Sequence, residues 1–265
     1  NGRGSTITVS GDWTSSGGLI GKSALDLDGS QDVDCGNDSS IRPTDAITLT
    51  AWINADNLST DYANIISCED SGGGGYAIRV RDDGDIYFRL NEASAVQSTS
   101  SITAGKWHHI ACTYNKDAGS NQQKIYIDGK LVGQGTYTSA ITDYDINTFI
   151  GSRDGDSLYF DGKIAQVSIW NAALTAAQIR TAMFQDYTAV SKTNLQAWYQ
   201  FDEGTGTDVA DSTGTNDGTL SSAAWAGNGG YTQGASTLTM AKTGTQYIYG
   251  KSGLWLNNLT VNNGS

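Results

Sequence analysis

Proline, cysteine and basic residues are all scarce in this sequence. It contains 1 proline against 33 glycines, so its turns must be made mainly by Gly, Asn and Asp. Its 16 lysines and arginines face 28 aspartates and glutamates, which gives a net charge of -12. Because nucleic-acid phosphates need a basic surface, this balance argues against nucleic-acid binding. No apolar run is long enough to cross a bilayer, so we expect no membrane insertion.

The few cysteines do not form a metal-binding pattern. Cys35, Cys68 and Cys112 are odd in number and none lies in a Cys-x-x-Cys spacing, so a structural zinc site is not expected. Cys68 and Cys112 each lie in an apolar stretch, which favours small buried core residues. Whether one disulfide joins two of the three stays open at this point.

The residues that would support catalysis are also sparse. Glycoside hydrolysis needs two carboxyl groups flanking the scissile bond, yet Glu69, Glu92 and Glu203 are the only glutamates and they are not clustered. His108 and His109 are the only histidines, and adjacent strand residues point to opposite faces, so they do not make one two-histidine site. We therefore expect no enzyme, and a glycan hydrolase is disfavoured.

Alternation of apolar and polar residues predicts antiparallel strands with one buried face. It is clearest between residues 76 and 91, where Asp83-Gly84 predicts a hairpin turn. The side chains that share the apolar face are Ile78, Val80, Ile86, Phe88 and Leu90. With 265 residues, the chain accommodates one large all-β domain, or one domain plus a small partner.

One helix is predicted in this otherwise β-rich sequence. Asp161-Gly162 is typical of a tight turn, and the β-branched and aromatic residues from 164 to 170 predict a strand. Thr175 then suits a helix N-cap, and Gln178 completes a capping box. Ile179 and Met183 supply an i, i+4 apolar stripe.

Several motifs together resemble the laminin G-like, concanavalin A-like jelly rolls of the pentraxin type. The motifs are 25-LDLDGS-30, 49-LTAWI-53, 106-KWHHIA-111, 125-IYIDGKLVG-133 and the strand and helix between residues 160 and 184. The resemblance covers roughly residues 18–225 and implies an all-β fold, a concanavalin A-like antiparallel β-sandwich with one short helix. Residues 195–220 are interpreted as completing this sandwich; the alternative is the start of a second, truncated copy. Lectins, adhesion modules and glycan hydrolases share the fold, so it does not specify a function.

The two ends resemble the Ser/Thr/Gly-rich β-repeats of bacterial surface and secreted proteins. We expect residues 1–17 and 230–265 to pair as one small β-repeat platform, with the jelly roll of residues 18–229 inserted into a surface loop of it. The chain opens on Asn1 without a signal-peptide pattern. We interpret it as one piece of a longer repeat protein, located outside the cell or on its surface.

The polar face of the hairpin is the main candidate for ligand binding. Three of the seven arginines, Arg79, Arg81 and Arg89, share that face with Tyr87. Guanidinium groups bind carboxylates or sulfates and aromatic rings stack on sugars, so an exposed face would suit an acidic glycan. The alternative is pairing with nearby aspartates. Further candidates are the loops with Asp61, Tyr62 and Asn64 and with Asp154, Asp156 and Tyr159, and Trp198, whose parity predicts exposure.

Calcium is the expected cofactor, if there is one, because oxygen ligands are plentiful. The candidate ligands are Asp28, Asp32 and Asp34, together with Asp211 and Asp217 in a later loop. The resemblance implies an acid in the closing strand, where this chain has Ala165 and Gln166. The same residues are also typical of simple Asp-rich turns.

Two functions remain compatible with the sequence. One is a non-catalytic carbohydrate-binding or adhesion module of a larger surface or secreted protein, with a glycan or cell-surface ligand. The other is a purely structural or protein-binding unit of a surface or fibre protein. The state of the arginine-bearing face, either open or covered by its own chain, separates them.

Overall fold

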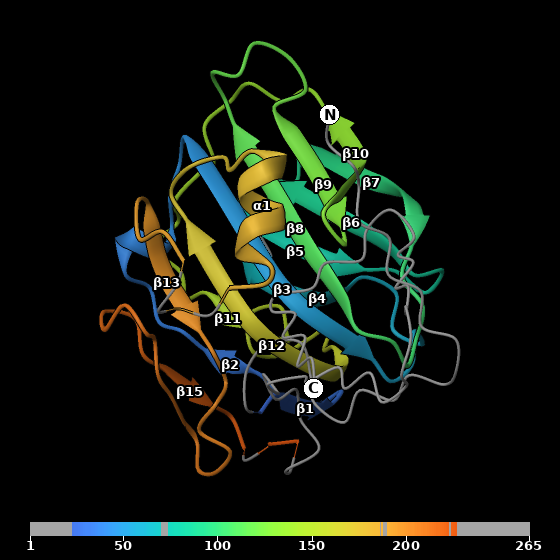
Figure 1. The fold of residues 1–265 in the computed structure, drawn as a ribbon, viewed down its shortest axis with the longest axis vertical. Helices are drawn as coiled ribbons and strands as arrows, with labels where there is room; N and C mark the ends of the chain where they lie inside the picture. The colour runs from blue at the N-terminus through green and yellow to red at the C-terminus, as the bar shows by residue number, and fades with distance from the viewer. Residues whose placement is uncertain (1–22, 70–73, 186, 188–189, 223, 227–265) are drawn as a thin grey trace, which may run out of the picture.

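The computed structural model describes residues 23–69, 74–185, 187, 190–222 and 224–226. Two antiparallel sheets pack face to face as a β-sandwich, and a single short helix lies on the outside of one sheet (Figure 1). The predicted all-β sandwich with one helix is confirmed. The platform expected from residues 1–17 and 230–265 lies outside the described residues and stays a prediction.

The seven-stranded sheet has β3 and β8 at its centre. Its order is β1-β12-β3-β8-β9-β10, and β13 also pairs with β12. The strands are β1 (Leu25–Asp28), β3 (Ala46–Ala55), β8 (His108–Asn115), β9 (Gln123–Ile127), β10 (Lys130–Gly135), β12 (Asp161–Trp170) and β13 (Leu195–Tyr199).

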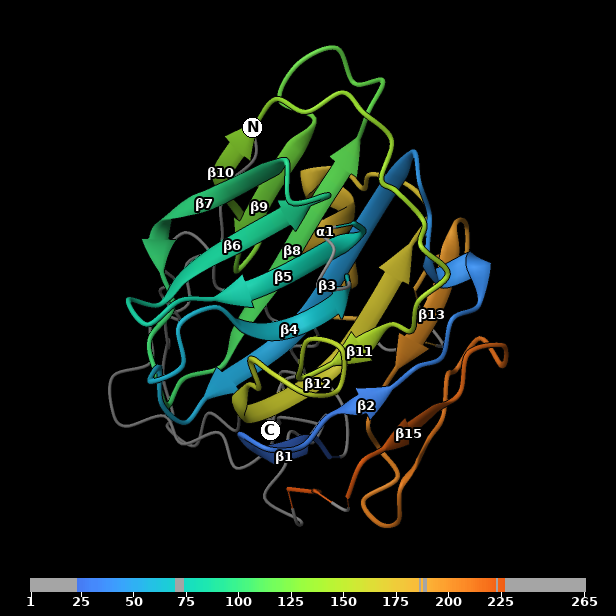
Figure 2. The same cartoon turned by 180° about the vertical axis from the view of Figure 1, so that it is seen from behind.

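The eight-stranded sheet forms the opposite layer, which Figure 2 shows from its outer side. Its order is β14-β15-β2-β11-β4-β5-β6-β7. The strands are β2 (Val33–Asp34), β4 (Ala63–Cys68), β5 (Tyr76–Val80), β6 (Asp85–Leu90), β7 (Ser94–Ser101), β11 (Phe149–Ile150), β14 (Asp208–Val209) and β15 (Gly218–Leu220). A 3-10 turn, η1 (Ser39–Ile41), precedes β3.

The core lies between the two sheets and follows the predicted alternation. Ile78, Ile86 and Phe88 of the β5–β6 hairpin are each 0% exposed. Burying a side chain of this size stabilises the fold by roughly 1.5–3 kcal/mol. The hairpin turns at Gly84, whose φ of 83° is accessible to glycine at little cost. Because successive side chains of a strand alternate between its two faces, burial of these apolar residues places the arginines of the hairpin on its outer face.

Residues 195–220 complete the sandwich, as interpreted from the sequence. β13 pairs with β12 in one sheet, while β15 pairs with β2 in the other. This placement contradicts the alternative of a second, truncated copy. The three cysteines are buried and free, so no disulfide joins them.

The helix α1 (Ala176–Ala182) begins where the capping box predicts. The Thr175 hydroxyl accepts a hydrogen bond from the backbone N–H of Gln178, and the Gln178 side chain accepts one from the backbone N–H of Thr175. Ile179 and Met183 are buried, and α1 lies over the outer face of the seven-stranded sheet (Figure 1). Trp52 anchors its end by donating an indole hydrogen bond to the Met183 carbonyl.

The turn predicted at Asp161-Gly162 is wrong. Both residues lie at the start of β12 and pair with β1, and Gly162 also pairs with Ala55 of β3. Gly162 has a φ of 139°, and a Cβ there would lie 2.3 Å from the Asn54 carbonyl oxygen. Glycine is required because β3 approaches this closely, so its presence reflects sheet packing and not a turn.

Candidate functional site

The outer face of the β5–β6 hairpin carries the candidate ligand-binding residues. Arg79 on β5 pairs across the sheet with Tyr87 on β6, and Arg89 on β6 pairs with Ala77. Because their neighbours in sequence fill the core, these side chains point away from it. Arg81 lies just beyond β5, beside the turn. We call Tyr62, Arg79, Arg81, Tyr87 and Arg89 the arginine face.

One end of the arginine face is an internal ion network around Glu69. Arg79 forms an ion pair with Glu69, and their side chains are 7% and 2% exposed. Arg89 lies 3.5 Å from the second Glu69 oxygen and also pairs with Glu92. Burial and the nearby charge of Arg89 lower the Arg79 pKa to about 10, so Arg79 remains charged at neutral pH. The predicted alternative of pairing within the chain therefore holds for Arg79 and Arg89, with glutamates instead of aspartates as the main partners.

The other end of the arginine face is aromatic and partly exposed. The rings of Tyr62 and Tyr87 meet edge to face, with centroids 5.3 Å apart. The Arg81 guanidinium lies 5.4 Å from the centre of the Tyr62 ring. Arg81 is 25% exposed and also pairs with Asp83 at 3.2 Å and with Asp61 at 3.5 Å. Two half-exposed rings beside a guanidinium and two carboxylates offer both a stacking surface and hydrogen-bonding groups.

The second predicted surface is contiguous with the first. The Asn64 backbone N–H donates to the Leu158 carbonyl at 2.8 Å, which joins the β11–β12 loop to β4. The Asn64 side chain in turn accepts a hydrogen bond from Arg79 at 3.2 Å. Figure 2 shows this loop next to β4, the strand that lies between β11 and the β5–β6 hairpin. The structure thus brings the two candidate loops to one side of one sheet.

The predicted exposure of Trp198 is wrong. Trp198 is 3% exposed, and its indole N–H donates to the Gln166 side chain at 2.7 Å. Trp170 and Tyr187 pack against its ring edge to face. Parity correctly places Trp198 on the outer face of its sheet, but α1 and the segment after it cover that face. A ring enclosed in this way offers no platform for a sugar.

The five aspartates proposed as calcium ligands hold loops of their own chain. Asp32 accepts a hydrogen bond from Ser152 at 2.5 Å, and Asp34 accepts two from Asn147. Asp28 accepts hydrogen bonds from the backbone N–H and the hydroxyl of Ser30. Asp211 accepts hydrogen bonds from the backbone N–H groups of Trp198 and Asn216, and its own backbone N–H donates to the Asp217 side chain. Within the described ranges, no group of three or more His, Cys, Asp or Glu side chains could hold a metal ion. The five aspartates therefore do not come together as one set of ligands, and a calcium site stays a prediction.

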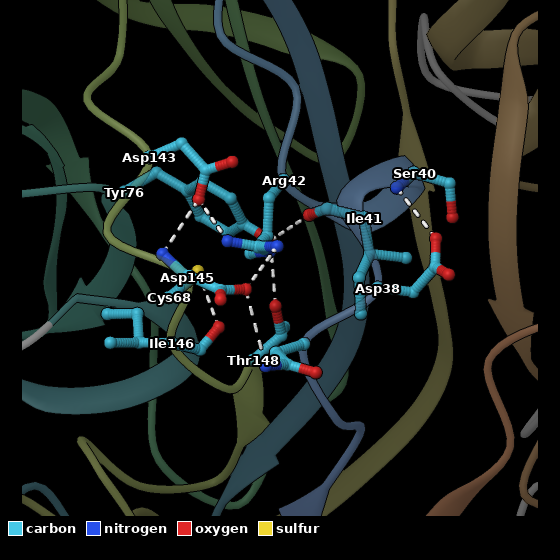
Figure 3. A network of polar contacts seen from close by, with 11 residues as sticks. Asp38, Ser40, Ile41, Arg42, Cys68, Tyr76, Asp143, Asp145, Ile146 and Thr148 are labelled. Atoms are coloured by element: carbon cyan, nitrogen blue, oxygen red, sulfur yellow. Dashed lines mark hydrogen bonds and ion pairs between the residues drawn. The ribbon is translucent and has the colours of Figure 1, made fainter.

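A second polar network closes the opposite end of the hairpin (Figure 3). Arg42, which follows η1, pairs with Asp143 and with Asp145 in the loop between β10 and β11. The Tyr76 hydroxyl donates to the Ile41 carbonyl at 2.6 Å. The sequence analysis did not single out this loop, because 143-DYD-145 has the composition of any polar turn. Its one available signal was an aromatic residue between two acids.

Comparison with known proteins identifies the family of the chain. Residues 27–180 match the family model of the concanavalin A-like lectin/glucanases superfamily. The chain belongs to this superfamily. Among curated proteins it is similar to the rat (Rattus norvegicus) Sushi, von Willebrand factor type A, EGF and pentraxin domain-containing protein 1, at 25% identity over 168 residues. That match covers 60% of this chain and 5% of the relative.

Solved structures share the fold at low sequence identity. A putative carbohydrate-binding protein from Bacteroides ovatus superposes with a TM-score of 0.61 and 20% identity, over 78% of this chain and 59% of the other. The CBM40 of a Ruminococcus gnavus sialidase, bound to α2,3-sialyllactose, superposes with a TM-score of 0.51 and 12% identity, over 62% of this chain and 98% of the other. These likenesses establish the fold. Among the described residues, no helix is long and apolar enough to span a membrane.

Proposed function

We propose that this chain is a non-catalytic carbohydrate-binding module of a larger extracellular or cell-surface repeat protein. The observation that supports it best is the exposed end of the arginine face, where Tyr62, Tyr87 and Arg81 gather on an open sheet surface. The rings supply apolar faces for the C–H groups of a pyranose, and the charged groups supply hydrogen bonds to hydroxyls. The carbohydrate-binding proteins that share the fold make the same class of ligand reasonable here.

The charges of this face favour a glycan held by stacking and hydrogen bonds over one held by net positive charge. Arg79 and Arg89 are neutralised by Glu69 and Glu92, and Arg81 by Asp61 and Asp83. An acidic sugar would have to compete with these carboxylates. We therefore expect neutral glycans to bind at least as well as sialylated or uronate-containing ones, which revises the preference for an acidic glycan predicted from the sequence.

The alternative is a structural or protein-binding unit, with the arginine face serving only to hold the sheet and its loops. The buried Glu69 network supports it, because a network of that kind stabilises one packing arrangement without any ligand. A purely structural role, however, does not explain the partly exposed aromatic end of the arginine face.

A glycan array with and without calcium separates the two functions. We expect binding by the wild-type chain, reduced in Arg81→Ala and Tyr62→Ala and unchanged in Lys116→Ala. Lys116 is the matched control because it is a half-buried cation paired with two aspartates elsewhere. Binding that needs added calcium would support the predicted ion site. A blank array with folded protein would contradict the proposal and favour the alternative.

A further inference from the structure

Tyr62, at the exposed end of the arginine face, has a backbone conformation that is unusual for its residue type. Its φ is 63°, in the left-handed region, which a bulky residue rarely adopts because its Cβ crowds the following carbonyl oxygen. Such a conformation persists only where the surrounding structure holds it, and backbone of this kind gathers at ligand sites. A neighbouring group must therefore hold Tyr62 in place.

The side chain of Asn64 is that group. Asn64 is 0% exposed, and its side-chain N–H donates to the Tyr62 carbonyl at 3.3 Å. Its side-chain oxygen accepts from Arg79 Nε at 3.2 Å. A guanidinium only donates and a carbonyl only accepts, so these two partners fix which way the amide points. Both ends of the Asn64 amide are thus used inside the protein.

An irregularity in β4 turns Asn64 toward the arginine face. The register of β4 against β5 shifts between Asn64 and Ile66, as it does at a β-bulge that redirects a side chain. Asn64 pairs with Arg79 across the sheet, and its backbone N–H is held by the Leu158 carbonyl. Leu158 also has a positive φ, of 51°. Two departures from regular backbone therefore converge on one buried amide.

A continuous chain of contacts joins the buried ion network to the exposed rings. Arg79 contacts Asn64 through Nε and Glu69 through Nη2. Asn64 in turn holds the backbone of Tyr62. The Tyr62 ring lies edge to face against Tyr87, with 74° between the two ring planes. The buried network therefore ends at the two rings that the proposed function places against a sugar.

We infer that Asn64 is a positioning residue for glycan binding. Because it is 0% exposed, it does not contact the sugar; it holds the Tyr62 ring against Tyr87, so that the stacking surface exists before a glycan arrives. A surface formed in advance loses little conformational freedom on binding, which improves affinity. The inference rests on the proposed carbohydrate-binding function and names the buried residue on which its stacking surface depends.

NMR of the whole chain without any sugar tests the positioning itself. Asn64→Asp keeps the size of the side chain and an acceptor for Arg79, but it replaces the donor to the Tyr62 carbonyl with a second acceptor. We expect this variant to lose the contacts between the Tyr62 and Tyr87 rings, and the φ-dependent coupling of Tyr62 to change to that of a negative φ. Asn64→Ala adds no charge and should show the same loss, so it serves if Asn64→Asp does not fold.

Asn91→Asp is the matched control for this substitution. Asn91 is a half-buried amide at the end of the hairpin away from its turn, and it donates to the Ala140 carbonyl at 2.7 Å. The same change of amide to carboxylate there should leave the ring contacts of Tyr62 as in the wild type. Wild-type ring contacts in Asn64→Asp, or their equal loss in Asn91→Asp, would refute the inference.

The glycan array, read at several protein concentrations, tests the consequence for binding. Asn64→Asp should lower the affinity for the bound glycans by about tenfold, because without the hydrogen bond the left-handed conformation of Tyr62 is the less populated one. In a Tyr62→Ala background the same substitution should change the affinity by less than about twofold, since Asn64 acts through the ring that is missing. A general effect on the fold would lower the affinity equally in both backgrounds.

The array also separates this inference from the proposed function. Unchanged affinity in Asn64→Asp, or equal losses in the two backgrounds, would overturn the role of Asn64 and leave the carbohydrate-binding function in place. A blank array with folded wild-type protein would contradict the proposed function, and with it the role of Asn64 in binding.

Discussion

Lowering the pH should destabilise this protein through one buried histidine. His109 on β8 is 2% exposed and lies under α1, with its ring 5.3 Å from that of Trp52. Its Nδ1 has no hydrogen-bond partner among the described residues. Burial is the main cause that lowers the His109 pKa from 6.5 to about 4, and Asp128 opposes this only in part. The folded protein therefore holds His109 neutral down to about pH 4.

The size of the effect follows from that shift. Each pKa unit corresponds to about 1.4 kcal/mol, so the shift corresponds to roughly 3 kcal/mol of unfolding free energy. Between pH 6.5 and 4 the unfolded chain binds a proton at His109 that the folded chain does not. Stability is therefore unaffected by His109 above about pH 6.5, falls as the pH decreases, and loses the full amount near pH 4. Single domains have unfolding free energies of about 5–15 kcal/mol, so the loss is readily measured.

Urea denaturation at several pH values between 7 and 4 tests this reasoning. His109→Gln places a polar side chain of similar size that cannot titrate. The unfolding free energy of this variant should therefore fall less than that of the wild type as the pH is lowered, and near pH 4 the two losses should differ by about 3 kcal/mol. His108→Gln is the matched control: it replaces the neighbouring histidine, which begins β8 and hydrogen-bonds to Asp128, but leaves His109 in place, so it should lose stability on acidification as the wild type does. Parallel pH curves for wild type and His109→Gln would refute the reasoning.

Other consequences concern the helix cap, the ion network and the thiols. Thr175→Ala removes the hydroxyl that accepts the Gln178 N–H but keeps the backbone N–H that donates to the Gln178 side chain, and it should lower the unfolding free energy by about 1 kcal/mol in denaturant titrations, whereas an unchanged midpoint would contradict the cap. Arg79→Ala leaves the buried Glu69 with Arg89 alone, 3.5 Å from its second oxygen, and should cost about 3 kcal/mol, whereas Arg81→Ala should cost little; equal losses by the same assay would contradict the two environments. Burial raises the pKa of the buried cysteines, to about 12 for Cys35 and about 11 for Cys68. Native protein at pH 8 should therefore react slowly with a thiol reagent and denatured protein quickly, and rapid labelling of the native state would show that the thiols are accessible.

The sequence predicts the sandwich well because strand alternation and helix capping are local signals. The β5–β6 hairpin has its apolar residues inside and its arginines outside, as a period of two requires. Thr175 and Gln178 form the predicted capping box within four residues of each other. Each of these features is decided by neighbours in the chain, so each can be inferred before the fold is known.

The sequence predicts the candidate site less well, because the site depends on what covers a surface. Trp198 has the parity of an outward residue, yet α1 and Tyr187 enclose it. Asp161-Gly162 has the sequence of a tight turn, yet glycine is needed there because the backbone of β3 passes so close to it. Glu69 gives no sign in the sequence that it pairs with two arginines of the hairpin, because that contact forms only when the sheet is assembled.

The central claim is that the exposed end of the arginine face binds a glycan. Its most direct test is an NMR titration with a glycan selected from the array, which maps the residues whose signals shift. The account predicts the largest changes at Tyr62, Arg81 and Tyr87, together with weaker binding by Tyr87→Ala. Saturable binding with no changes on that sheet face, or wild-type affinity in Tyr87→Ala, would contradict it.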